Sequence, residues 1–393
     1  MAAADVVVVG GGANGTSTAF QLALAGVKKV VLLERGQLGA GASGKSGALV
    51  RMHYTNPVES RLAMESLKIF KNWSDIVGGE CGFDSTGFVQ IVAPENEQKL
   101  RANIAAQQAM GINTSVISAQ ELKEIEPDAR TDDLTYVGYE PDTGYADPNA
   151  TVYAFAEAAR RLGVDIRTNV EVTKVIVEND RVAGVETSEG RIDAETVVLA
   201  PGAWANRLLA PLGLDFELIP HRAQVAVFRW PPSFNHRHPV FIDSIASSWL
   251  RVEGTKSTLI GLEAGVNNAD IDHIDEGVDE PYVEVCRTQL ARRLPVFAQA
   301  TMRGGWAGVF MMSPDGRPII DQIPSVPGLF CMMGDSGTSF KTSPAIGKCL
   351  AEWIVYGEPR TVDLTPFRST RFAEGQPWKD ENSYGTKRLT ISR

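Results

Sequence analysis

The sequence predicts a mixed α/β fold in which two domains are interleaved along the chain. Residues 5–33 alternate strand, glycine-rich turn, helix and strand, as at the start of a parallel sheet covered by helices. Strands that run into glycine-rich turns recur at residues 196–204 and 329–343, whereas residues 218–262 are almost entirely strand-like. We therefore expect a Rossmann-like domain and a second domain made mostly of strands.

The composition limits the functions that the chain can have. Its 393 residues carry 38 basic and 48 acidic side chains, a net charge of −10, and 44% of the residues are hydrophobic. The acidic balance argues against nucleic acid or an anionic membrane as the main partner. No apolar run approaches the roughly 18 residues that span a bilayer. The N-terminal valines lack the basic residue of a signal peptide, and four scattered cysteines fit a reducing compartment, so we expect a cytoplasmic location.

The N-terminal turn predicts a dinucleotide site. A β-branched strand is followed by a G-x-G-x-x-G pattern, formed by Gly10, Gly12 and Gly15. A helix over residues 16–26 comes next, and a second strand over residues 29–33 ends in Glu34. In such units the glycines let the backbone approach a pyrophosphate, the helix N-terminus offers N–H groups, and the acid accepts bonds from a ribose. An acid here, rather than an arginine, favours an unphosphorylated ribose.

The segment after this acid favours a flavin over a nicotinamide nucleotide. Residues 37–47 are rich in Gly, Ala and Ser, which form a poor core but can lie against a ligand. A short NAD dehydrogenase would usually enter another helix at this point. Flavin-binding chains of the two-domain type insert such a loop and then leave the Rossmann sheet.

The rest of the chain mixes helices and strands without an internal repeat. Helices are expected at residues 57–77, 95–110, 119–125, 148–162, 278–294 and 344–356. Strands are expected at residues 88–92, 164–167, 170–177, 182–187, 196–200, 224–229, 240–242, 249–252, 259–261 and 329–333, and within residues 305–320. From residue 369 the chain is polar and charged, so we expect a loosely held tail over residues 369–393.

Five segments, taken in the order in which they occur along the chain, resemble the family of FAD-dependent amine and amino-acid oxidoreductases typified by D-amino-acid oxidase, glycine oxidase and sarcosine oxidase. Within that family the chain is most similar to monomeric sarcosine oxidase and the sarcosine oxidase β-subunit type. The similarity covers nearly the whole chain, to about Pro366. The five segments are the dinucleotide turn, the Gly/Ser loop with residues 49–51 after it, and residues 196–204, 313–321 and 334–347.

The resemblance implies the domain plan and the cofactor site. It assigns residues 1–80, 148–215 and 305–368 to an FAD-binding domain, and residues 81–147 and 216–304 to a substrate domain on a large, mostly antiparallel sheet. It places FAD against residues of both glycine-rich regions and the strands beside them: Gly10, Gly12, Gly15, Glu34, Arg35, Ser43, Ser46, Gly47, Leu49, Val172, Ala200, Gly202, Trp204, Gly337, Thr338, Ser339, Phe340 and Lys341.

The glycine-rich turn at residues 337–341, which we call the late turn, also suits a flavin for a physical reason. Ser343 and Pro344 form a good N-cap and first-turn pair, so a helix is expected to begin there with its positive end facing the glycine turn. Such an end beside a flavin's pyrimidine edge would stabilise the negative charge of the reduced ring.

The resemblance also implies residues that hold the substrate. In the sarcosine oxidase group an arginine after the Gly/Ser loop and a lysine in the late turn bind the substrate carboxylate, and these positions are Arg51 and Lys341 here. A guanidinium fork and an ammonium in a partly desolvated pocket make a sound carboxylate receptor. Tyr54 and His53 are expected to line the same pocket.

Two departures from the family change what is expected. Monomeric sarcosine oxidase attaches its flavin through a cysteine that would fall near Gly308, and no cysteine lies between Cys286 and Cys331, so noncovalent FAD is expected. Those relatives also use a lysine on the substrate sheet to activate oxygen. Here residues 258–262 contain none and Lys256 is out of register, so both oxygen and an unknown carrier remain possible electron acceptors.

The function that the resemblance implies is oxidation of the C–N bond of a small amino acid or N-alkyl amino acid by hydride transfer to FAD. The imine product then hydrolyses, and the small-molecule partner carries a carboxylate. Two alternatives stay open: a flavin-dependent 2-hydroxy-acid dehydrogenase on the same scaffold, and a flavoprotein subunit of a hetero-oligomeric dehydrogenase complex. No metal site is expected, because His236 and His238 fall in a proline-rich turn.

Overall fold

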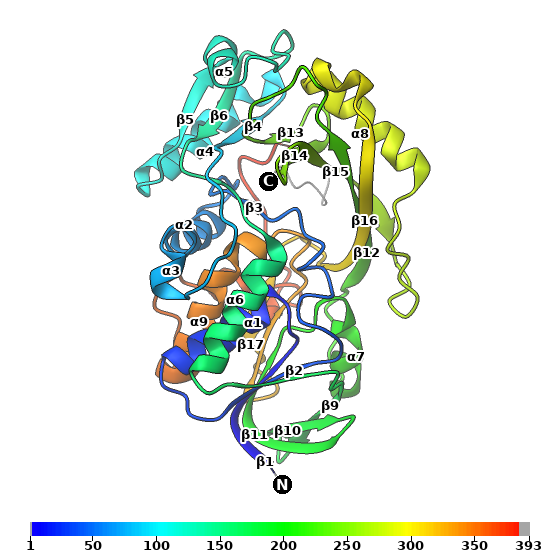
Figure 1. The fold of residues 1–393 in the computed structure, drawn as a ribbon. Helices are drawn as coiled ribbons and strands as arrows, with labels where there is room; N and C mark the ends of the chain where they lie inside the picture. The colour runs from blue at the N-terminus through cyan, green and yellow to red at the C-terminus, as the bar shows by residue number, and fades with distance from the viewer. Residues whose placement is uncertain (1, 385–393) are drawn as a thin grey trace.

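Two large sheets organise the chain, and the computed structural model describes residues 2–384 (Figure 1). In the first sheet every pairing from β18 through β11, β1 and β2 to β8 is parallel, as a Rossmann-like domain requires. Its spatial order is β17 (Ile319–Gln322), β18 (Leu329–Met333), β11 (Gly190–Leu199), β1 (Ala2–Val9), β2 (Val30–Glu34) and β8 (Asp165–Thr168), with β10 (Arg181–Thr187) on β11 and β9 (Val172–Glu178) on β10.

The central strands of this sheet are buried on both faces. Val6 and Val8 of β1 belong to the core beneath one layer of helices, while Val7 and Val9 belong to the core on the other face. This alternation explains why the strand reads as a continuous apolar run. The covering helices are α1 (Ala13–Leu24), α2 (Pro57–Lys71), α3 (Trp73–Ile76), α6 (Pro148–Arg161) and α9 (Ser343–Tyr356) on the first core, and α7 (Ala205–Leu209) on the second.

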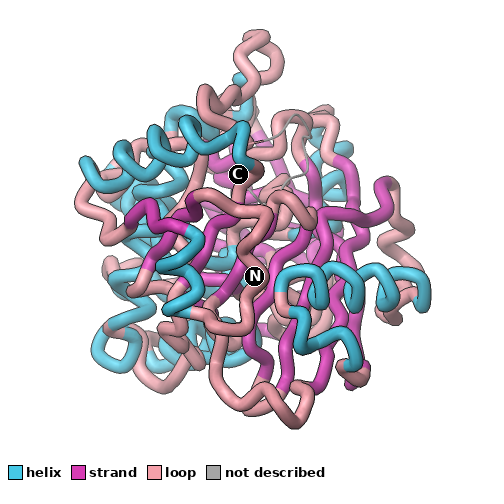
Figure 2. Tube along the Cα trace, turned by 90° about the horizontal axis from the view of Figure 1, so that it is seen from above, coloured by secondary structure: helices cyan, strands magenta, loops and turns pink. Residues whose placement is uncertain are grey.

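The second sheet is antiparallel at every pairing except β13 with β4. Its order is β16 (Met302–Met312), β12 (Ile219–Arg229), β15 (Ser257–Asn267), β14 (Ser248–Glu253), β13 (Val240–Asp243), β4 (Phe88–Ile91), β6 (Tyr136–Glu140) and β5 (Ser115–Ser118). Around this sheet lie α4 (Glu97–Ala109), α5 (Ala119–Ile125) and α8 (Glu280–Arg293). Viewed from above, strands run through the middle of the molecule and helices lie toward its sides (Figure 2).

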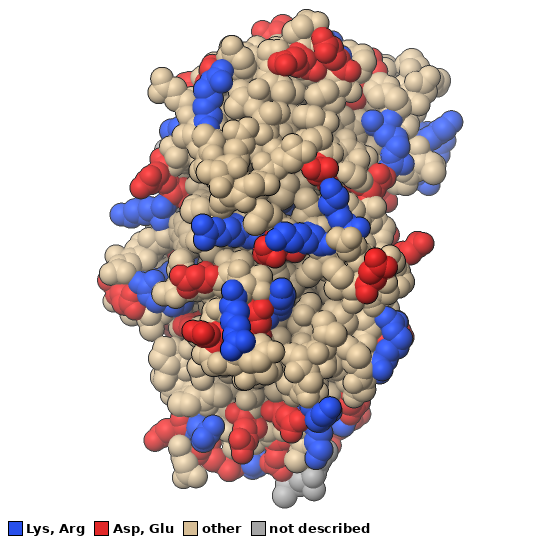
Figure 3. Space-filling model, turned by 90° about the vertical axis from the view of Figure 1, so that its left-hand side faces the viewer, with Lys and Arg blue, Asp and Glu red and all other residues tan. Residues whose placement is uncertain are grey.

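Short elements complete the path between the two sheets. A two-stranded ladder joins β3 (Leu49–Val50) to β7 (Gly144–Tyr145) where the chain leaves the Gly/Ser loop. Single 3₁₀ turns occupy Pro94–Asn96, Gly202–Trp204, Ala210–Leu212, Pro295–Gln299, Phe340–Thr342, Thr365–Phe367 and Ser369–Arg371. Among residues 2–384, no helix has both the length and the apolar content that crossing a membrane requires. The face shown in Figure 3 mixes acidic and basic side chains.

The boundary expected at residue 305 falls inside a strand. Gly305 pairs with Ala226 and Met311 pairs with Pro220, so β16 is one continuous strand of the second sheet. Glycines at the start of this strand hide its continuity in the sequence. The edge strand β5 and its neighbour β6 were also not expected, because they are short and β5 begins and ends in serine.

The loosely held tail expected from residue 369 is wrong for the part that the structure describes. Both the backbone N–H and the hydroxyl of Ser369 donate to Asp321, at 2.8 and 2.7 Å. Arg371 is buried and donates to Asp315 at 2.8 and 3.0 Å. Arg371 and Asp380 therefore form buried ion pairs, whereas residues 373–377 are exposed, and residues 385–393 lie outside the described part of the chain.

Candidate active site

A cavity of about 880 Å³ connects the two sheets. It begins at the turn between β1 and α1 and ends against strands β12, β14, β15 and β16. Of the residues predicted to bind the cofactor, those that line it are Gly10, Gly12, Glu34, Arg35, Ser43, Ser46, Gly47, Val172, Ala200, Gly202, Trp204, Gly337, Ser339 and Phe340. Gly15, Leu49, Thr338 and Lys341 are not part of its wall.

The glycine turn is shaped by close backbone approach. Gly10 has φ +109°, and a Cβ on it would lie 2.2 Å from the carbonyl oxygen of Ala200. A Cβ on Gly15 would lie 1.9 Å from the carbonyl oxygen of Gly10, so Gly15 packs α1 against the turn instead of facing the cavity. The helix therefore begins directly behind the turn, with its N–H groups toward the cavity.

Side chains around this turn hold it in place. The Glu34 carboxylate accepts bonds from the N–H groups of Gly11 and Gly36, each at 2.7 Å. The Ser43 hydroxyl accepts from the N–H of Ala13 at 3.0 Å, which brings the Gly/Ser loop against the first turn of α1. Glu34 thus orders the turn, and its predicted role toward a ribose stays a prediction.

Two buried polar atoms on the cavity wall suit a nucleotide ligand. The side-chain oxygen of Asn14 and the indole N–H of Trp204 are buried and have no hydrogen-bond partner among residues 2–384. Buried polar groups are normally satisfied, so a ligand that carries both donors and acceptors fits these atoms. The Arg35 guanidinium lies 4.5 Å above the Trp204 ring. These residues therefore fit one end of a dinucleotide.

The other end of the cavity is walled by aromatic side chains that sequence reasoning missed. The Trp249 ring presses on the Gly/Ser loop, since a Cβ on Gly47 would lie 2.2 Å from it. Between β12 and β15 the pairing shifts from Val225–Gly261 to Ala223–Gly265, so residues 262–264 bulge out and line the cavity. The glycines on either side of this bulge are the only signal that the sequence offers for it.

The late turn meets the glycine turn from the opposite side. Asn14 of α1 donates to the Ser339 hydroxyl at 3.0 Å, although the two residues are 325 positions apart. The predicted helix start is wrong by one position. A 3₁₀ turn places Thr342 at the N-cap and Ser343 in the first turn, where its hydroxyl donates to the carbonyl of Phe340 at 2.8 Å.

The structure brings Arg51, Lys341 and Tyr54 together directly behind this turn. The Tyr54 hydroxyl and the Lys341 ammonium both donate to the carbonyl of Thr338, at 3.0 and 2.9 Å. The Arg51 guanidinium carbon lies 4.5 Å, and the Lys341 ammonium nitrogen 5.0 Å, from the centre of the Tyr54 ring. All three side chains are buried and none belongs to the cavity wall, to which this turn contributes Gly337, Ser339 and Phe340.

Burial dominates the electrostatics of this cluster. Desolvation lowers the pKa of Arg51, while Tyr54, Glu140 and Glu59 act against that shift. Burial raises the pKa of Glu140 to about 7, even though its carboxylate accepts a bond from the Met52 N–H at 2.9 Å. An arginine stays charged across the physiological range, so Glu140 is the member of this cluster that titrates near neutrality.

The His53 ring contacts the side chains of Gln107 and Tyr384. Its Nδ1 lies 3.1 Å from the Gln107 side-chain oxygen, and its Nε2 lies 2.8 Å from the Tyr384 hydroxyl. Desolvation and the Arg51 charge lower the pKa of His53 to about 3, so the ring is neutral. Its role toward a substrate stays a prediction.

The two histidines of the proline-rich turn and the nearby lysine have their contacts outside this cluster. His236 pairs with Glu126 at 2.8 Å and lies 3.9 Å from Asp128, whereas His238 is buried and lies 2.8 Å from the Thr258 hydroxyl. These two histidines therefore do not converge. Lys256 is exposed in the turn between β14 and β15, outside the cavity wall.

A Rossmann-like sheet with a glycine turn, and a cavity that runs from this turn to a second, mostly antiparallel sheet, are typical of a flavin-dependent oxidoreductase. The chain belongs to the FAD dependent oxidoreductase family, whose sequence model matches residues 5–353. The family, the fold class and the FAD cofactor expected from the sequence are confirmed.

Three relatives show how far the similarity extends. The chain is 28% identical to sarcosine oxidase subunit beta of Arthrobacter sp, over 94% of this chain and 91% of that protein. It is 27% identical to mitochondrial dimethylglycine dehydrogenase of Rattus norvegicus, over 97% of this chain and 47% of that protein. The crystal structure of L-proline dehydrogenase from P. horikoshii superposes with a TM-score of 0.89 at 25% identity, over 96% of this chain and 100% of that chain. The chain thus spans less than half the length of several curated relatives that it matches.

Proposed function

We propose that the chain uses noncovalent FAD to oxidise the C–N bond of a small N-alkyl amino acid, giving an imine that hydrolyses. The observation that carries this proposal is the meeting of two buried cations, Arg51 and Lys341, at the Tyr54 ring behind the cavity. Relatives named for sarcosine and dimethylglycine support the same class of substrate. A substrate carboxylate is an anion that such a pair of cations can bind by charge-assisted bonds.

The residues that line the cavity support noncovalent binding of FAD. The glycine turn and the start of α1 would hold the pyrophosphate, Glu34 the ribose, and the Gly/Ser loop with the late turn the flavin ring. When bound, FAD supplies a two-electron acceptor for the substrate. No cysteine lies near Gly308, so acid should release all of the flavin as FAD.

The protein's own part in the reaction is binding and orientation. Arg51 and Lys341 would hold the carboxylate by charge-assisted bonds, each worth about 1.5–3 kcal/mol. Tyr54 links the two cations. Its hydroxyl and the Lys341 ammonium share the Thr338 carbonyl as acceptor, and the Arg51 guanidinium lies over its ring. Fixing the carboxylate restricts the orientation of the neighbouring C–N bond, and such restriction supplies a large part of catalysis.

A second candidate is a flavoprotein subunit that passes electrons to a partner. The similarity to a protein named as a subunit extends over nearly the full length of both chains, which favours this candidate. The position of Lys256 outside the cavity also favours it. Without a lysine in register on β15, turnover with oxygen should be slower than with an artificial dye. Oxygen use that equals dye reduction at saturating substrate would rule out this reasoning.

Anaerobic reduction of the bound flavin tests the proposed function directly. The FAD-loaded chain is mixed with sarcosine, dimethylglycine, proline, glycine or a 2-hydroxy acid, and the loss of the flavin's visible absorption is followed. We expect rapid loss with at least one N-alkyl amino acid and slow loss with the 2-hydroxy acid. Reduction by the hydroxy acid alone would replace the amine assignment with the alternative dehydrogenase.

A further inference from the structure

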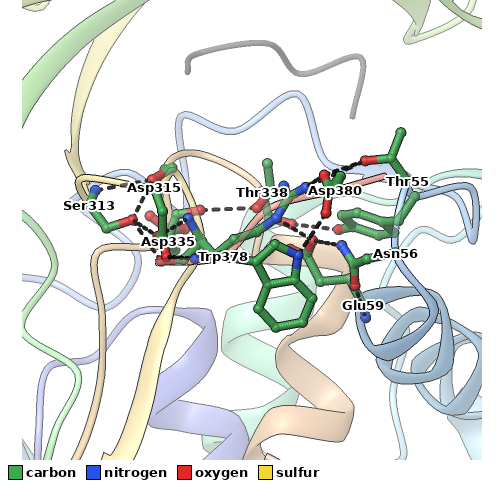
Figure 4. A network of polar contacts seen from close by, with 12 residues as sticks. Thr55, Asn56, Glu59, Ser313, Asp315, Asp335, Thr338, Trp378 and Asp380 are labelled. Atoms are coloured by element: carbon green, nitrogen blue, oxygen red, sulfur yellow. Dashed lines mark hydrogen bonds and ion pairs between the residues drawn. The ribbon is translucent and has the colours of Figure 1, made fainter. Parts of the chain in front are cut away.

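A buried arginine joins three segments beside the substrate cluster. Arg317 is 2% exposed and lies in the loop between β16 and β17. Its guanidinium pairs with Glu59 of α2 at 3.2 Å, donates to the Thr55 hydroxyl at 3.4 Å, and forms an ion pair with Asp380 (Figure 4). The site described above uses neither Arg317 nor Asp380.

Asp380 strengthens the same junction from the C-terminal side. Its carboxylate also accepts from the Thr55 hydroxyl at 2.6 Å and from the Trp378 indole N–H at 2.7 Å. The backbone N–H of Trp378 donates in turn to Asp315 at 2.9 Å. Three carboxylates and one guanidinium therefore fasten the C-terminal segment to residues 55–59 and 315–317, as Figure 4 shows.

Beyond Asp380 the segment lies between α4 and the Arg51 loop. Residues 378–384, which we name the strap, accept bonds from Asn96, Lys99 and Asn103 at 2.8 to 3.1 Å. At its end, the Tyr384 hydroxyl meets His53 at 2.8 Å, and the two rings stack with their centres 5.8 Å apart. In Figure 1 this last part of the chain runs through the middle of the molecule, between the two sheets.

The strap thus contacts the residues on both sides of Tyr54. His53 bonds to Tyr384 and Thr55 bonds to Asp380, while Tyr54 itself reaches the late turn through Thr338. Burial raises the pKa of Tyr384 and the Arg51 charge lowers it, as expected for groups that lie close together. A shift of residues 53–55 would therefore move the Tyr54 ring against which both cations lie.

We propose that Arg317 and Asp380 are positioning residues, whose ion pair holds the strap against residues 53–55 and so fixes Arg51 and Tyr54 for a substrate carboxylate. This inference rests on the proposed function only for the identity of that carboxylate. Arg317 suits this task because a planar guanidinium can bind several acceptors at once in a fixed geometry. Lysine at this position would keep the charge but could not hold Glu59, Thr55 and Asp380 together.

The test uses the full FAD-loaded chain and the variants Arg317→Lys, Arg317→Met and Asp380→Asn. Asp243→Asn is the matched control, because Asp243 forms a buried pair with Arg293 at 2.7 Å in the second sheet, outside the cavity wall. Propionate is the probe, since it carries a carboxylate and no C–N bond to oxidise. Its dissociation constant is measured from the perturbed flavin absorption, and hydrogen exchange is measured for peptides that cover residues 51–56 and 378–384.

We expect Arg317→Met to raise the propionate dissociation constant by about tenfold or more, and Asp380→Asn and Arg317→Lys by several-fold, while the FAD content stays at the parental level. Exchange over residues 51–56 should become faster in the same order. In the parent, saturating propionate should slow exchange in the strap. Asp243→Asn should lower the melting temperature without changing either measurement. If Arg317→Met does not fold, the Arg317→Lys and Asp380→Asn variants carry the test.

Two results would overturn the inference. In the first, the Arg317 and Asp380 variants lower the melting temperature as much as Asp243→Asn does. Their propionate affinity and their hydrogen exchange over residues 51–56 nevertheless equal those of the parent. The other is a parent that does not bind propionate, because there would then be no carboxylate for the strap to position. The parent and the variants could also differ in propionate affinity as expected while no amino acid reduces the parent's flavin. That result would refute the proposed function but would support the positioning role of Arg317 and Asp380.

Discussion

The two ends of the candidate site are held together by different kinds of contact. At the glycine turn the N–H groups of Gly11 and Gly36 bind the Glu34 carboxylate within one short stretch of chain, and glycines set the shape. At the Tyr54 cluster the contacts come from charged and aromatic side chains of segments nearly 300 positions apart. The first end should therefore depend on local backbone geometry, and the second on whether distant segments keep their positions.

Gly10→Ala should have the largest effect. The residue has φ +109°, and the new Cβ would meet the Ala200 carbonyl at 2.2 Å, so both strain and overlap oppose it. Overpacking of this kind typically costs about 1–3 kcal/mol, and strain at a positive φ adds to it. We expect loss of bound FAD and a lower melting temperature. Gly304→Ala is the control, since a Cβ there meets nothing within 4 Å, and it should keep FAD at the parental level.

Glu140→Gln should change how stability depends on pH. Burial raises the pKa of Glu140 to about 7, so between pH 4.5 and 7 the folded chain keeps a proton that the unfolded chain releases. The parent's free energy of unfolding should therefore fall as the pH rises through this window, by up to about 3 kcal/mol from this group. Urea unfolding at pH 5 and pH 8 measures the fall. The glutamine variant should lack this part of it, and an equal fall in both proteins would mean that Glu140 is already ionised at pH 5.

Glu34→Ala should weaken FAD binding by about 1–3 kcal/mol, because a charged acceptor is lost from the turn. In the structure this carboxylate also accepts from the N–H groups of Gly11 and Gly36. Titration of the FAD-free chain with FAD gives the affinity. Glu34→Gln keeps one acceptor oxygen and should lose less. Equal losses in the two variants would show that the charge, and not the acceptor, sets the affinity.

Local sequence was enough to predict the glycine turn, because a strand, three glycines, a helix and an acid lie within about 30 residues of one another. Arg51 and Lys341 were assigned only through the resemblance to a family, and nothing in their own neighbourhoods shows that they meet at Tyr54. The contacts of His53 with Tyr384 and of Arg317 with Asp380 join residues 331 and 63 positions apart. Polar residues near the C-terminus look solvated in the sequence, since burial in ion pairs depends on partners that no local pattern reveals. The bulge at residues 262–264 could not be predicted either, because it depends on the register between β15 and β12.

The central claim is that Arg51 and Lys341 bind the substrate carboxylate, and anaerobic flavin reduction by the Arg51→Ala variant tests it most directly. The expected result is that the limiting efficiency with the best N-alkyl amino acid falls by about tenfold or more, which corresponds to about 1.4 kcal/mol, while FAD stays bound. An amine without a carboxylate should be a poor substrate for the parent and should lose little in the variant. Reduction of the Arg51→Ala flavin at the parental rate and affinity by the same amino acid would contradict the claim.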